Sequence, residues 1–227
     1  EELLDYFNKL KTSGDVILAE ETEYGVHAKF NTGMWYIYAR KNTETSSAAS
    51  NDMNIFSLQP FKTEFADRNV ETERVDAMAT DMAAQNIANT FENYRFSKNL
   101  DDEDVTLNII KDFSTNQVIL WSGHGLYDRN LGPCLVTGDD YIDNKDYDFD
   151  EVIYLTNGEE NGKCLITPKF VRNNVSDLTG SFMYLSTCSS FKDERLVCAF
   201  KKKNIAALVA NTDIINTIYT SNLMACT

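Results

Sequence analysis

The sequence has few histidines, and its cysteines are not paired at the spacing that metal sites use. It holds five cysteines, none of them in a C-x-x-C pair, and only two histidines. Structural zinc sites and haem attachment depend on such closely spaced ligands, so the sequence argues against both. An odd number of cysteines also leaves at least one thiol outside any set of intrachain disulfides.

The chain also lacks an excess of basic residues and a long apolar run. Lys and Arg number 21 against 35 Asp and Glu, which gives a net charge of -14. This charge disfavours nonspecific binding to nucleic-acid phosphates or anionic lipid and weakly favours a basic substrate. No apolar run approaches the roughly 18 residues that a membrane span needs. With 227 residues and only three prolines, the chain fits one large globular domain or two small ones.

The two ends of the chain carry expectations of their own. The sequence starts at Glu1 with neither an initiator Met nor a signal peptide, which predicts a mature fragment or an excised domain. The N-terminus therefore does not indicate the cellular compartment. The end falls inside a predicted helix that begins near Ile214, so a further C-terminal portion is expected.

Residues 1–50 are predicted to form a helix and a small antiparallel β appendage. Three short strands are expected at residues 15–20, 24–30 and 34–40, and Asn31-Thr32-Gly33 reads as the hairpin turn between the last two. Residues 41–52 are small and polar, as in a linker. His27 has no carboxylate or thiol at a ligand-like spacing, so it is interpreted as an ordinary strand residue.

After residue 50, strand and helix patterns alternate in the way that is typical of βαβ units. Strands are predicted at residues 54–59, 94–97, 117–121, 182–185 and 205–210, and helices at 71–93, 105–113 and 196–203. Short hairpins are expected around an acidic segment at residues 138–151. The sequence therefore predicts an α/β domain over residues 51–227, with a mainly parallel sheet flanked by helices.

Two polar clusters follow apolar strands and call for a chemical explanation. Residues 117–121 lead into Ser122-Gly123-His124-Gly125, and residues 182–185 lead into Ser186-Thr187-Cys188. The carboxyl ends of parallel strands meet at one edge of a sheet, where ligands bind, so His124 and Cys188 are expected to be neighbours. Small polar residues and then the helix predicted at 196–203 follow Cys188, and the N-terminal dipole of that helix would favour the thiolate form. A plain turn at His124 and a buried structural Cys188 are the alternatives.

The remaining cysteines are predicted to have structural roles. Cys198 and Cys226 stand among apolar helical residues and are expected in the core. Cys134 and Cys164 lie in hairpin-like segments without a nearby histidine.

The His cluster precedes the Cys cluster, which excludes papain-like and transglutaminase-like chains, because in those the Cys comes first. In this order the sequence resembles the caspase-like, or CD clan, cysteine peptidases. Residues 118–125 match the strand and His-Gly of that clan, and residues 182–188 match its strand and Cys turn. The turn at 185–190 looks most like the bacterial CHAT and clostripain-type branches. The resemblance covers about residues 54–213 and supplies the expected sheet order, a caspase-like one.

The resemblance implies an endopeptidase that uses a His124/Cys188 dyad, needs no metal and is often made as a zymogen. It points to the backbone N–H groups of Gly125 and Cys188 as the oxyanion site. Asp213 follows the next strand and would line a pocket for Arg or Lys before the scissile bond, or else cap the helix after it. Lys145 is the expected site of self-cleavage. A bacterial secreted or cell-surface location is favoured over the cytoplasm.

Other interpretations of the sequence stay open at this point. The acidic segment at 138–151 resembles a calcium loop but has Lys145 where an EF-hand needs glycine, so a solvated loop is expected instead and no cofactor is predicted. The rival function is a catalytically silent caspase-like module that binds a protein partner through an acidic surface. A third possible function is a structural or adhesion role for the N-terminal strands, with the rest of the chain as a scaffold.

Overall fold

The structure is a computed structural model that describes residues 2–22, 25–31, 34–39, 52–67, 71–141, 147–154 and 162–214. Its helices are α1 (Glu2–Ser13), α2 (Lys62–Asp67), α3 (Glu71–Thr90), α4 (Leu107–Lys111), α5 (Pro168–Asn174) and α6 (Arg195–Lys201), with a 3₁₀ turn at Asp102–Asp104. Its strands are β1 (Val16–Thr22), β2 (Gly25–Phe30), β3 (Met34–Ala39), β4 (Met53–Gln59), β5 (Tyr94–Asp101), β6 (Gln117–Ser122), β7 (Gly125–Asp128), β8 (Gly132–Asp140), β9 (Val152–Tyr154), β10 (Lys163–Ile166), β11 (Phe182–Ser186) and β12 (Ala207–Asn211).

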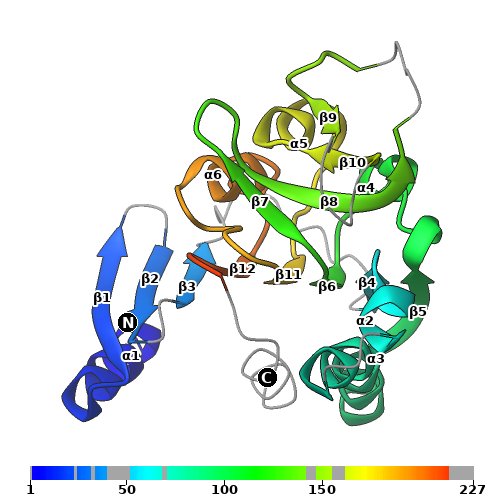
Figure 1. Cartoon of the computed structure of the whole chain (residues 1–227). Coiled ribbons are helices and arrows are strands. Elements are labelled where there is room, and N and C mark those ends of the chain that lie inside the picture. Colours follow the sequence, from blue (N-terminus) through cyan, green and yellow to red (C-terminus); the bar gives the residue numbers. More distant parts are fainter. Residues whose placement is uncertain are drawn as a thin grey trace.

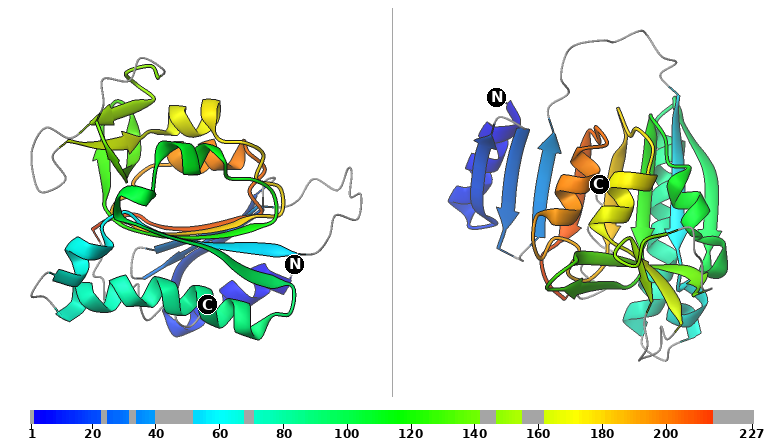
Figure 2. Two further views of the ribbon diagram at one scale, coloured as in Figure 1. Left: turned by 90° about the vertical axis from the view of Figure 1, so that its right-hand side faces the viewer. Right: turned by 90° about the horizontal axis from the view of Figure 1, so that it is seen from above.

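The centre of the molecule is an eight-stranded sheet in the order β1-β2-β3-β12-β11-β6-β4-β5 (Figure 1). Its five strands β12, β11, β6, β4 and β5 run parallel to one another. Helices cover both faces, with α4, α5 and α6 on one side and α1 and α3 on the other (Figure 2). The predicted α/β class, with a parallel sheet flanked by helices, is confirmed.

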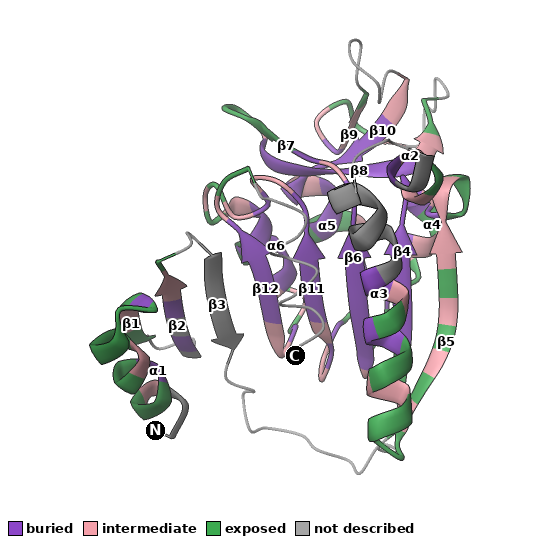
Figure 3. Ribbon diagram, turned by 60° about the horizontal axis from the view of Figure 1, so that its bottom comes forward, coloured by how far each residue is buried: buried purple, intermediate pink, exposed green. Residues whose placement is uncertain are grey.

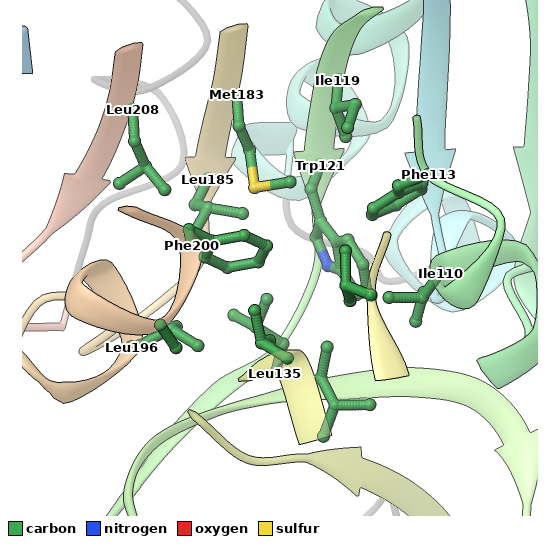
Figure 4. Close-up of a cluster of buried hydrophobic side chains, with 14 of the residues drawn as sticks. Ile110, Phe113, Ile119, Trp121, Leu135, Met183, Leu185, Leu196, Phe200 and Leu208 are labelled. Carbon is green, nitrogen blue, oxygen red and sulfur yellow. The ribbon is translucent and has the colours of Figure 1, made fainter. Parts of the chain in front are cut away.

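The inner strands are apolar because both of their faces are covered. All six residues of β6 are buried, whereas burial alternates along the edge strand β5 (Figure 3). Ile119 and Trp121 point into the larger core cluster, together with residues of β11 and α6 (Figure 4). Val118 and Leu120 point to the opposite face and pack with residues of α3. Successive side chains of a strand point to opposite faces, so a continuous apolar run is what a central parallel strand requires.

The N-terminal strands are antiparallel, as expected, but they do not form a sheet of their own. β3 pairs with β12, and β1 and β2 continue the central sheet beyond it. A small separate cluster of Phe7, Val16, Val26 and Ala28 holds α1 against these strands. The domain division at residue 50 stays a prediction, and residues 40–51, which include nearly all of the predicted linker, lie outside the described residues.

A second sheet, β7-β8-β10-β9, is antiparallel and begins directly after His124. The expectation of a solvated loop holds for residues 147–150, which lie outside helices and strands with Asp148 71% exposed, but residues 138–140 belong to β8 and Glu151 is buried. Asp139 accepts a hydrogen bond from the Leu107 backbone N–H at the start of α4, and burial raises the pKa of its carboxyl group. Lys169 pairs with Asp148 and Asp150. These acidic side chains therefore bind neighbouring segments together; residues 142–146, including Lys145, lie outside the described part.

The elements near the carboxyl edge differ in detail from those expected. α2 was not predicted, whereas α6 (Arg195–Lys201) matches the helix predicted at residues 196–203 to within two residues at each end. The helix expected from Ile214 onward lies outside the described residues. Of the helices in the described part of the chain, none combines the length and apolar character that a membrane crossing needs.

Candidate functional site

The strand register brings the two predicted clusters to the same edge of the sheet. β6 and β11 are parallel neighbours, and Ser122 is paired with Ser186 at their carboxyl ends. His124 and Cys188 each stand two residues beyond this pair. The Gly123 backbone N–H donates to the carbonyl oxygen of Ser186 at 3.2 Å, so the two chains remain in contact as they leave the sheet.

Gly125 packs directly on the backbone of Cys188. A Cβ at Gly125 would lie 2.2 Å from the Cys188 carbonyl oxygen and 3.1 Å from the Thr187 Cβ. No side chain fits in that space, so glycine is needed here for close approach rather than for an unusual φ angle. The contact fixes the His-Gly segment against the turn that carries Cys188.

The imidazole of His124 is held by α2 and by Phe61, the residue before it. Its ring lies edge-on to Phe61 and Phe65, with centroids 4.7 and 5.1 Å away. Its Nε2 lies 3.7 Å from Glu64 Oε1, and the two side chains are 23% and 28% exposed. The His124 carbonyl oxygen accepts a hydrogen bond from the Val136 N–H in β8. The aromatic rings restrict rotation of the imidazole, and the Glu64 carboxylate lies beside its Nε2.

Glu64 is the site residue that the sequence did not reveal. It lies far before His124 in the chain, in a helix of six residues that carries no distinct sequence pattern. The position of Glu64 depends on contacts that other residues of α2 make with distant segments of the chain. Lys62 forms ion pairs with Asp81 and Asp101, and Thr63 hydrogen-bonds to Asp102 through its backbone N–H and its hydroxyl.

These anchors are strong enough to change the titration of Lys62. Burial alone would lower the pKa of this lysine, but the hydrogen bonds and charges of Asp81 and Asp101 outweigh burial and raise it. Lys62 therefore keeps its charge, and α2 stays tied to α3 and β5 through two carboxylates.

Residues 187–194, here called the Cys188 loop, connect β11 to α6 as turns and bends. α6 starts at Arg195, one residue before the predicted helix, and the expectation that its N-terminal dipole acts on the thiol stays a prediction. The loop is held by the end of β12. Ser189 has a φ angle of +55°, and its N–H donates to the Asp213 carbonyl oxygen at 3.0 Å. Asn211 donates its side-chain amide to the carbonyl oxygens of Leu185 and Thr187.

Asp213 reaches the same edge, but its carboxylate is occupied. Its side chain is 71% exposed and lies 3.2 Å from the ammonium of Lys192. The carboxylate also accepts a hydrogen bond from the Ile214 N–H, and this bond, with Lys192, lowers the pKa of Asp213. A substrate cation would thus have to share this carboxylate with Lys192.

The other cysteines differ clearly from Cys188, which is a half-buried free thiol. Cys134 and Cys164 are buried, and burial raises the pKa of their thiols to about 12 and about 11. The expectation that Cys198 is a core residue is wrong: it is exposed on α6, between the buried Val197 and Ala199. Cys226 lies outside the described residues.

Within the described ranges, no three His, Cys, Asp or Glu side chains gather as metal ligands would. A scan of protein-family models, a search of curated proteins and a search of solved structures found no match for this chain. The fold and the site thus define an α/β protein that carries a histidine and a half-buried cysteine just beyond the carboxyl ends of two adjacent parallel strands.

Proposed function

We propose that this protein is a cysteine endopeptidase with a caspase-like fold, in which Cys188 is the nucleophile and His124 the acid and base. The observation that carries the proposal is the contact of Gly125 with the Cys188 carbonyl at the paired ends of β6 and β11. This contact holds the His-Gly segment and the Cys188 turn together at the edge where α/β proteins bind ligands.

The chemistry follows from the residue types. The thiolate sulfur of Cys188 attacks the scissile carbonyl carbon, and the resulting oxyanion accepts hydrogen bonds from the N–H groups of Gly125 and Cys188. The C–N bond breaks as His124 gives its proton to the leaving amine. Water then attacks the thioester while His124 takes its proton, which releases the acid and restores the thiolate.

Cys188 is the thiol best suited to this role among those described. The raised pKa values keep Cys134 and Cys164 as neutral thiols at neutral pH, and both side chains are buried. Cys198 is exposed, but it lies on the helix beyond the Cys188 loop. Synthesis as a zymogen, self-cleavage after Lys145 and a secreted or cell-surface location remain parts of the proposal.

Alkylation of the folded protein tests the proposal against a silent binding module. The protein is treated with iodoacetamide or a peptidyl acyloxymethyl ketone, and each cysteine is followed by peptide mass spectrometry. An activated thiolate predicts labelling of Cys188 far faster than of exposed Cys198, which serves as the internal control for access. Equally slow labelling of all five thiols would favour the partner-binding module.

Replacing Glu64 by glutamine is expected to lower kcat about fivefold with little change in KM. The substitution keeps the shape of the side chain but removes the negative charge 3.7 Å from His124 Nε2. A partly exposed ion pair contributes up to about 1 kcal/mol, which is about fivefold in rate. Steady-state kinetics, compared with the remote Glu92→Gln variant, measures this loss; an unchanged kcat would remove Glu64 from the mechanism.

Asp213 is expected to give the enzyme a modest preference for substrates with Arg or Lys before the scissile bond. Because the carboxylate is exposed and shared with Lys192, its contribution is about 1 kcal/mol or less, or about fivefold in kcat/KM. The measurement compares fluorogenic peptides with Arg, Lys, Asp or Asn at that position on the wild type and on Asp213→Asn.

The matched control for that measurement is Asp177→Asn, at an aspartate that pairs with Asn204 away from the Cys188 loop. An unchanged Arg preference in Asp213→Asn, or a wild-type preference for Asp or Asn, would exclude Asp213 from the substrate pocket.

A further inference from the structure

Arg195 connects the Cys188 loop to the hairpin that follows His124. It is the first residue of α6, and its side chain is 34% exposed. On the loop side its Nε and Nη2 donate to Asp193 Oδ2 at 2.9 and 2.6 Å, and its backbone N–H donates to Asp193 Oδ1. Three hydrogen bonds thus hold the end of the Cys188 loop to one guanidinium and its backbone.

The same guanidinium binds the turn between β7 and β8. Its Nη1 donates to the carbonyl oxygen of Asn130 at 2.6 Å, and its Nη2 donates to that of Arg129 at 3.1 Å. Its Cζ lies 5.9 Å from the centre of the Tyr127 ring. A Cβ at Gly132, whose φ is +97°, would lie 2.9 Å from Nε, so the turn closes directly on the side chain.

The turn itself has the shape that this contact requires. The Asp128 carboxylate accepts hydrogen bonds from the backbone N–H groups of Asn130 and Leu131. With their N–H groups bound on the inside of the turn, the carbonyl groups of residues 129 and 130 are available to the guanidinium. Arginine suits this place because its planar group presents several donors at once in a fixed geometry, whereas lysine presents a single charge.

Three contacts therefore join the segments that carry His124 and Cys188. Two of them lie at the edge of the sheet: the Gly123 N–H on the Ser186 carbonyl oxygen, and Gly125 against the Cys188 carbonyl. The third, Arg195 between Asp193 and the β7–β8 turn, lies beyond that edge. It restricts pivoting of the two segments about the sheet edge, since β7 begins at the residue after His124 and the loop ends just before Arg195.

We propose that Arg195 is a positioning residue that sets the distance and orientation between His124 and Cys188 by clamping the β7–β8 turn to the Cys188 loop. This inference rests on the proposed peptidase function. Reacting groups displaced by about 1 Å can lose about 10²-fold in rate. A positioning role therefore predicts a loss in kcat rather than in substrate binding.

The test compares Arg195→Met, Arg195→Lys and the control Arg172→Met, an exposed arginine on α5. Arg195→Met is expected to lower kcat about 10²-fold with KM changed less than about threefold. Arg195→Lys is expected to recover part of this loss, because an ammonium pairs with Asp193 but does not span both carbonyl groups. Hydrogen exchange at residues 129–131 and 187–194 should rise in Arg195→Met and remain unchanged in Arg172→Met.

The outcomes separate this inference from the proposed function. An active wild type whose Arg195→Met variant keeps kcat within twofold overturns the clamp and leaves the peptidase intact. An inactive wild type overturns the proposed peptidase function. Hydrogen exchange in Arg195→Met then decides on the clamp alone: a rise at both 129–131 and 187–194 supports it, and no rise overturns it. If Arg195→Met does not fold, Asp193→Asn takes its place. This variant is expected to lower kcat about tenfold, again with little change in KM.

Discussion

Cys188→Ala is expected to lower peptidase activity by about 10⁴-fold or more while leaving the protein folded. Removing the nucleophile of a covalent mechanism costs several orders of magnitude, because no other group can form the acyl intermediate. The fold should tolerate the change, since the thiol is only half-buried and the Cys188 loop is held by other groups, among them Asn211 and the backbone of Ser189. Steady-state kinetics and thermal unfolding measure the two effects separately.

His124→Ala should cause a loss of similar scale, because no other imidazole lies at this edge of the described structure. Cys198→Ala is the matched control. It removes an exposed thiol from α6 and is expected to leave kcat unchanged. Full activity in Cys188→Ala would contradict the assignment outright.

Gly125→Ala is expected to reduce kcat about 10²-fold to 10³-fold. The added Cβ would lie 2.2 Å from the Cys188 carbonyl oxygen, which is backbone and cannot rotate away. The His-Gly segment and the Cys188 turn must therefore move apart by about 1 Å, which disturbs both the dyad and the N–H groups proposed to bind the oxyanion. Overpacking of this kind also costs about 1–3 kcal/mol of stability.

The control for this variant is Gly180→Ala, at the other end of β11. Its φ of +77° and the nearby Asn116 side chain make the substitution destabilising too, but far from the Cys188 loop. Thermal unfolding should show a loss in both variants, and activity per folded molecule should fall in Gly125→Ala alone. Equal activity in the two would mean that the close contact of Gly125 has no part in catalysis.

The inner part of the fold could be predicted from local patterns. Residues 118–121 and 182–185 are continuous apolar runs, and a strand buried on both faces needs such a run. The edge on which His124 and Cys188 meet follows from the same reasoning, because parallel strands end at one edge. The alternation of strands and helices after residue 50 likewise predicted the α/β class that the sheet confirms.

Other features depend on contacts between segments that are distant in the chain. Cys198 has apolar neighbours in sequence, yet the turn of α6 directs it outward while Leu196, Val197 and Phe200 point inward. A seven-residue helix has one buried stripe, and sequence neighbours do not tell which residues form it. The ion pairs of the acidic segment were not predicted either, because Lys169, which pairs with Asp148 and Asp150, belongs to α5 and not to the segment itself.

The sequence by itself determined the parallel core and the placement of a histidine and a cysteine at its carboxyl edge, because burial and strand direction act through short, local patterns. Only the tertiary structure decided that β3 pairs with β12, that Glu64 faces His124 and that Arg195 joins the two loops. Each of these is a pairing of polar or backbone groups from remote segments. Such pairs leave no periodic signal, since their geometry exists only once the sheet has brought the segments together.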